Sequence, residues 1–153
     1  MTASSRQQLR SNLKLQAIQV KDELLYAVPI RGYAGYMAST CGRIISFVGH
    51  YNGQGRRFKA EPRILQPQER CNGYKKVILT SKSEGKAQMA VHRLVALAFL
   101  EQDSVDRKGH QRTHVNHING NPSDNRLCNL ELVTPLENNQ WSRVLADVKS
   151  KAS

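Results

Sequence analysis

The chain has 153 residues, which is enough for one domain or two very small modules, and its formal net charge is +11. This surplus favours a polyanionic partner, either nucleic acid or an acidic membrane surface; a solvated basic surface without a partner is the alternative. No apolar run approaches the roughly 20 residues that span a bilayer, and the polar N-terminus lacks the apolar centre of a signal peptide. We therefore expect no membrane-spanning segment, and we prefer nucleic acid to a membrane as the partner.

The three cysteines, Cys41, Cys71 and Cys128, lie far apart in the sequence. An odd number without C-x-x-C spacing argues against a disulfide framework and against a structural zinc site. A reducing cytosol fits best, so we expect a cytoplasmic protein whose thiols are small buried hydrophobic groups.

Residues 1–25 are predicted to form an N-terminal amphipathic arm. Within residues 5–25 the apolar side chains recur at a rough helical spacing, and they are Leu9, Leu13, Ile18, Leu24 and Leu25. Pro29 then ends any helix.

Residues 26–90 change to short apolar runs separated by Gly, Asn and Pro, which predicts a β-rich module with antiparallel strands. The clearest strand runs from Lys75 to Leu79, directly after a turn signal at Asn72 and Gly73. Residues 49–62 are predicted to be an exposed basic loop. The cations of the module suit a surface that contacts phosphates; they are Arg31, Arg43, Arg56, Arg57, Lys59, Arg63, Lys75 and Lys76.

The C-terminal third predicts helix, strand, loop, strand and helix in that order. Apolar residues at helical spacing predict a short buried helix over residues 91–100. The stretch "THVNHI" alternates as a strand, with Val115 and Ile118 expected on its buried side, and "LELV" returns as a second strand. Thr134 begins a final helix with a capping box, because a Pro follows it and Glu137 stands three residues after the cap.

Asn138 lies one turn into this helix and is expected to project back across the strand pair towards His117. Asn116 and His117 leave opposite faces of an ideal strand, although a strand end or bulge can bring them to one site. Amide oxygens and retained waters suit Mg²⁺ or Mn²⁺, and an imidazole can deprotonate water. A structural His on a strand, with Asn residues in turns, is the alternative that these residues leave open.

Two segments resemble a known family. The stretch "VNHINGNPSDNRLCNLELVTPLEN", with "VHRLVALAF" upstream, resembles the HNH or ββα-metal motif of phage and intron-encoded homing endonucleases. The stretch "IRGYAGYMASTCGRIISF" resembles the modular DNA-binding motif that often precedes it. The resemblance implies an α+β fold, with an antiparallel β DNA-binding module over residues 26–90, a ββα-metal nuclease unit over residues 91–145, and a tail over residues 146–153.

The resemblance also implies a role for each matching residue. His117 matches the general base, and Asn129 matches the residue that braces the loop between the strands. Asn116 and Asn138 match metal ligands, and His92 matches a recurrent His whose role stays open. The neutral Asn116 stands where many relatives carry Asp, which predicts weak metal affinity.

The expected activity is divalent-metal-dependent hydrolysis of phosphodiester bonds in double-stranded DNA, by nicking, with one Mg²⁺ or Mn²⁺ ion and no zinc. Arg126 is expected to contact a phosphate, with a surface salt bridge as the alternative. A DNA-binding protein with an inactive HNH motif is the rival function, because Asn116 and Asn138 carry no charge. An RNA-binding module is a second rival, favoured by charge alone, since only 6% of residues are aromatic and base stacking needs aromatic rings.

Overall fold

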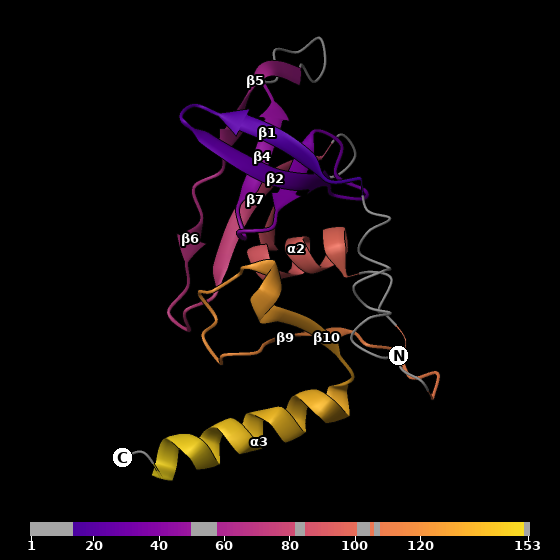
Figure 1. Ribbon diagram of the computed structural model, residues 1–153, viewed down its shortest axis with the longest axis vertical. Helices are drawn as coiled ribbons and strands as arrows, with labels where there is room; N and C mark the ends of the chain where they lie inside the picture. The colour runs from indigo at the N-terminus through magenta and orange to yellow at the C-terminus, as the bar shows by residue number, and fades with distance from the viewer. Residues whose placement is uncertain (1–13, 50–57, 82–84, 101–104, 106–107, 152–153) are drawn as a thin grey trace.

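The structure, a computed structural model, describes residues 14–49, 58–81, 85–100, 105 and 108–151 (Figure 1). Within these residues the chain has the predicted α+β fold with antiparallel sheets. A five-stranded sheet and a three-stranded sheet come first in the chain. A helix, a two-stranded hairpin and a second, longer helix follow them.

The five-stranded sheet has its strands in chain order, so each strand pairs antiparallel with the next one. Its members are β1 (Gln16–Val20), β2 (Glu23–Pro29), β3 (Tyr36–Ser39), β4 (Ile44–Val48) and β5 (Phe58–Ile64). The three-stranded sheet has the order β6 (Gln68–Glu69), β7 (Lys75–Ser81) and β8 (Gly85–Ala90). The predicted strand after the Asn-Gly turn is confirmed as β7.

The predicted helix over residues 5–25 is wrong in its described part, because β1 and β2 form a hairpin there. Ile18 pairs with Leu25 across this hairpin, and Lys21 lies in the turn with a positive φ of 52°. Leu25 is buried while its neighbour Leu24 is exposed, which is the period of two of a strand. Residues 1–13 lie outside the described residues.

The predicted loop over residues 49–62 is also wrong in part. Residues 58–62 belong to β5, which pairs with β4 through a register shift between Ser46 and Val48. Residues 50–57 lie outside the described residues. The three cysteines are free and exposed, so the prediction of buried thiols is wrong. No helix in the described part of the chain is long and apolar enough to cross a bilayer.

The predicted buried helix over residues 91–100 is confirmed as α2 (Val91–Phe99). Leu94 and Val95 of this helix are fully buried in one core with Ile44 of the large sheet, Leu79 of β7 and Leu130 of the hairpin. Figure 1 shows α2 between the strands of the first half and the C-terminal hairpin. This single core therefore fixes the hairpin relative to the upstream sheets.

The predicted order of strand, loop, strand and helix is confirmed at the C-terminal end. Its elements are β9 (His114–His117), the short 3₁₀ helix η2 (Leu127–Asn129), β10 (Leu130–Val133) and α3 (Pro135–Lys151). The predicted tail over residues 146–153 is helical as far as Lys151. Ile118 is 42% exposed and not buried as predicted, because β9 ends one residue before it and residues three apart leave opposite faces of a strand.

Candidate functional site

His117 is the last residue of β9, and its side chain is buried. Its Nε2 lies 3.1 Å from Oδ1 of Asn125, in the loop that follows the strand. Its ring centroid lies 5.2 Å from that of His92 on α2 and 5.8 Å from that of Tyr74, just before β7. The imidazole is therefore held by a hydrogen bond on one side and by two rings from other elements.

His92 is the second residue of α2, and its ring makes an edge contact with His117 and a tilted contact with Tyr74. The pKa of His92 is lowered to about 4, chiefly by burial and to a smaller extent by the charges of His117 and Arg93. Its Nδ1 is buried and has no hydrogen-bond partner among the described residues. His92 is consequently a neutral imidazole at neutral pH.

Asn116 precedes His117 in β9 and is also buried, at 8% exposure. Its Nδ2 donates a 2.8 Å hydrogen bond to Oε1 of Glu131, the residue directly opposite it in β10. Because adjacent strand residues leave opposite faces, the Asn116 amide lies on the other side of the hairpin from the His117 ring. The bond to Nδ2 turns the amide oxygen of Asn116 away from the carboxylate.

Asn138 is placed by the start of α3, where the predicted capping box is confirmed. The backbone N–H of Thr134 donates to the Glu137 carboxylate at 2.8 Å, and the backbone N–H of Glu137 donates to Oγ1 of Thr134 at 3.2 Å. The backbone N–H of Asn138 then donates to the carbonyl of Thr134 at 3.0 Å. This reciprocal cap fixes the first turn, and Asn138 lines a cavity of the structure.

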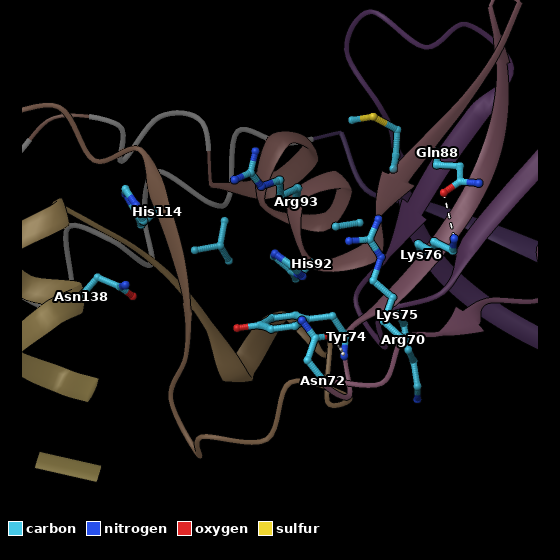
Figure 2. Close-up of a pocket in the computed structure, with 13 residues that line it drawn as sticks. Arg70, Asn72, Tyr74, Lys75, Lys76, Gln88, His92, Arg93, His114 and Asn138 are labelled. Atoms are coloured by element: carbon cyan, nitrogen blue, oxygen red, sulfur yellow. Dashed lines mark hydrogen bonds between the residues drawn. The ribbon is translucent and has the colours of Figure 1, made fainter. Parts of the chain in front are cut away.

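That cavity, which we call the cationic cleft, has a volume of about 480 Å³. Figure 2 shows Asn138 and His114 on one side of it, Arg70, Lys75 and Lys76 on the other, and Tyr74 and His92 between them. Arg93 of α2 adds a fourth full positive charge, and no Asp or Glu is among the lining residues. A cleft with one sign of charge concentrates anions.

Two other predicted DNA contacts are engaged in ion pairs. Arg43 pairs with Glu23 across the large sheet. Arg126 forms two hydrogen bonds with Asp124, of 2.8 and 2.7 Å, and the pKa of the Asp124 carboxyl lies well below its usual range chiefly because of them. Arg126 therefore forms the surface salt bridge that was the alternative to a phosphate contact.

The remaining predicted DNA contacts are spread along the β-rich module. Arg31 is exposed between β2 and β3, and Arg63 is exposed in β5. Lys59 is in β5, but its side chain lies outside the described part, as do Arg56 and Arg57 altogether. Of the predicted cations whose side chains the structure describes, Lys75 and Lys76 line the cationic cleft and the others do not.

Asn129 ties the loop between β9 and β10 together. Its Oδ1 accepts a hydrogen bond from the backbone N–H of Asn119 at 2.9 Å. Its Nδ2 donates to Oδ1 of Asn119 and to the carbonyl of Asp124, both at 2.9 Å. All three contacts are inside one loop, which is what a bracing residue does.

The β9–β10 hairpin and the first turn of α3 carry oxygen donors that suit a hard cation. The described residues contain no group of three or more His, Cys, Asp and Glu that could hold a metal ion. The oxygen donors that they do offer are the amide oxygens of Asn116 and Asn138 and the carboxylate of Glu131. Such a set fits Mg²⁺ or Mn²⁺ with several retained waters better than a softer ion.

Sequence reasoning missed Arg70 and Arg93 of the cationic cleft. It also missed Tyr74, Asn125 and Glu131, which contact His117 or Asn116. Glu131 could have been found from the sequence, because an antiparallel pairing of "VNH" with "LEL" puts it opposite Asn116. Tyr74 comes from a distant hairpin, so only the tertiary fold brings it to His117. Asn125 looked like one more turn residue in an Asn-rich loop.

In a comparison with known protein families, residues 89–140 match the HNH endonuclease family. These residues contain α2, the β9–β10 hairpin and the start of α3. An uncharacterized HNH endonuclease of Acanthamoeba polyphaga mimivirus is 36% identical over 120 residues, covering 78% of this chain and 26% of that protein. YosQ, a protein of the SPbeta prophage of Bacillus subtilis strain 168 that is named as an HNH homing endonuclease, is 42% identical over 67 residues, covering 44% of this chain and 35% of that one.

The chain thus spans about a quarter to a third of the length of these relatives. Among solved structures, the HNH homing endonuclease I-HmuI, which is described as binding and cleaving DNA, is similar with a TM-score of 0.54 and 27% identity. The similarity covers 82% of this chain and 65% of that chain, and so includes strands upstream of the family match. The resemblance to the HNH homing endonucleases is confirmed, and residues 89–140 of this chain match the HNH endonuclease family.

Proposed function

We propose that this chain is an endonuclease that hydrolyses phosphodiester bonds of double-stranded DNA, with one divalent ion, Mg²⁺ or Mn²⁺. One observation carries the proposal. His117, in the matching family segment, packs against His92 and Tyr74, and both of these line a cleft whose charged lining is entirely cationic. A backbone phosphate bound in that cleft would lie beside the imidazole.

His117 is the general base of this proposal. A neutral imidazole accepts a proton from water as the water attacks phosphorus, and the bond to Asn125 keeps the ring from rotating away. His92 stays neutral beside it, so this neighbour adds no positive charge that would oppose protonation of the base. We propose that His92 packs and positions the base without exchanging protons itself.

Asn116 and Asn138 are the proposed metal ligands, through their amide oxygens. Glu131 holds the Asn116 amide and adds a negative charge beside it, which offsets the missing Asp of the family pattern. A bound divalent ion would supply charge stabilisation at the phosphate and the leaving oxygen. Asn129 contributes by bracing the loop that carries Asn125.

The cationic cleft is the proposed path of the cleaved strand, with Arg70, Lys75, Lys76 and Arg93 contacting its phosphates. Arg31, which is exposed in the β-rich module of residues 26–90, is also proposed to contact the DNA backbone. Arg43 and Arg126 would reach phosphates only by giving up their carboxylate partners. Roles for Arg56, Arg57 and Lys59 remain predictions.

One base and one proposed ion suit a nick in a single strand. The proposed place of action is the cytoplasm of a host cell, which the three free, exposed thiols support, because oxidising compartments favour paired cysteines. The proposed nuclease unit is residues 91–145.

Incubation of supercoiled plasmid with the protein tests this function. Nicked circles should form with Mg²⁺ or Mn²⁺ and not with a chelator alone. The rival, a DNA-binding protein with an inactive motif, predicts retarded but supercoiled plasmid under every metal condition. Competition by single-stranded RNA as strong as that by duplex DNA would instead favour an RNA-binding module.

A further inference from the structure

The loop that carries Asn125 is enclosed by two turns of the upstream sheets. On one side the turn between β3 and β4 reaches it, and the carbonyl of Thr40 accepts a 2.9 Å hydrogen bond from the backbone N–H of Leu127. On the other side the turn between β6 and β7 reaches it, and Oγ of Ser123 donates a 2.7 Å hydrogen bond to the carbonyl of Gly73. Contacts distant in sequence thus hold both flanks of the loop.

The orientation of the Asn125 amide decides which tautomer of His117 is present. Asn125 is buried, at 5% exposure, and its Nδ2 faces the carbonyl of Ser123 at 3.4 Å. Turning the amide over would place two oxygen acceptors against each other, so Oδ1 must face His117. An acceptor 3.1 Å from Nε2 requires a proton on Nε2, which leaves the lone pair on Nδ1 as the basic atom of the ring.

Gly42, in the turn between β3 and β4, sets the position of Asn125. Its φ is +81°, and a Cβ at this position would lie 2.5 Å from both the carbonyl carbon and the carbonyl oxygen of Asn125. Backbone atoms cannot swing aside as a side-chain end can, so any larger residue displaces Asn125 itself. The turn is rigid, because Oγ of Ser39 bonds both the backbone N–H and the carbonyl of Arg43 at 3.0 Å.

We infer that Asn125 is the positioning residue of His117, and that the upstream sheet, through the close approach of Gly42, holds Asn125 where it fixes the orientation and tautomer of the base. The upstream module therefore shapes the catalytic unit as well as contacting DNA. This inference rests on the proposed role of His117 as a base, but its first measurement needs neither DNA nor metal.

The first measurement is the ring-nitrogen NMR spectrum of His117, at a pH where the imidazole is neutral. The wild-type protein should show the tautomer with the proton on Nε2. Asn125→Asp keeps the acceptor and should keep that tautomer, while Asn125→Leu, similar in size, should give a mixture. An unchanged tautomer in a folded Asn125→Leu protein would overturn the inference.

The second measurement separates the contact of Gly42 from its backbone strain. Gly32 has a nearly equal φ of +80°, but a Cβ there would meet nothing within 4 Å, so Gly32→Ala is the matched control for Gly42→Ala. Gly42→Ala should disturb the tautomer of His117 and lower kcat for nicking by about 10²-fold, as a misplacement of about 1 Å does, with KM little changed. Gly32→Ala should leave both unchanged.

Equal spectra and equal kcat in Gly42→Ala and Gly32→Ala would overturn the role of Gly42. Should Gly42→Ala not fold while Gly32→Ala does, the Asn125 pair of variants still decides the inference. If the wild-type protein fails to nick DNA, the proposed function falls, and the spectra continue to decide whether Asn125 fixes His117.

Discussion

Asn116 and Glu131 lie directly opposite each other in the β9–β10 hairpin, and the amide of one donates to the carboxylate of the other at 2.8 Å. An Asp at the first position would instead set two carboxylates side by side. The neutral amide avoids this repulsion in the metal-free hairpin, and in the proposed role of a metal ligand it would bind a hard cation less tightly than a carboxylate.

Asn116→Asp should consequently destabilise the metal-free protein by roughly 0.2–1 kcal/mol, because like charges then face each other across the strands. Mn²⁺ should remove or reverse this difference in the free energy of unfolding between Asn116→Asp and wild type, since a carboxylate binds a hard cation better than an amide does. Urea unfolding with and without Mn²⁺ measures both effects, and the double variant Asn116→Asp with Glu131→Gln is the control for repulsion. A stability difference between Asn116→Asp and wild type that Mn²⁺ does not change would show that Asn116 is not part of the metal site.

Asn138→Ala should raise the Mn²⁺ concentration needed for half-maximal nicking, whereas Asn138→Asp should hold or lower it. Asn139, the exposed next residue of α3, provides the control in Asn139→Ala. Thr134→Ala should reduce stability by roughly 0.5–2 kcal/mol through the lost cap, with a smaller effect on metal dependence. Identical Mn²⁺ titrations for Asn138→Ala and wild type would show that Asn138 is no ligand.

His92 should make stability depend on pH. Its folded pKa of about 4 lies below the ordinary 6.5, so folding favours the neutral ring and the unfolded chain takes up a proton first. This contribution is fully present above pH 6.5 and is lost as the pH falls towards 4. The stability of wild type should decline through that window more steeply than that of His92→Phe, measured by urea unfolding. Parallel curves would argue against a buried neutral His92.

The cationic cleft predicts how DNA affinity responds to salt. Arg70→Ala and Arg93→Ala should each reduce the slope of log affinity against log salt by about one, because each removes one phosphate contact. Lys86→Ala, on β8 but not among the cleft residues, should leave the slope unchanged. Equal slopes in all three variants would show that the cleft does not contact the DNA phosphates.

Local sequence signals predicted the C-terminal unit well. The capping box at Thr134, the buried face of α2 and the strand–loop–strand order all depend on residues close in sequence. The N-terminal hairpin was mispredicted because its few apolar residues fit a helical period as well as two short strands about Lys21.

Contacts made by the tertiary fold could not be predicted in this way. Tyr74 reaches His117 from another sheet, and Gly42 reaches Asn125 across more than half of the chain. The prediction that Ile118 is buried was also wrong. The end of β9 depends on the loop that Asn129 ties together and not on the alternation of "THVNHI".

The most direct test of His117 as the base is the single-turnover rate of DNA nicking in Mn²⁺, compared between wild type and His117→Ala at saturating protein. General base catalysis predicts a loss of about 10²–10⁴-fold in this rate, with DNA affinity retained. A folded His117→Ala protein that nicks DNA at the wild-type rate would contradict the account.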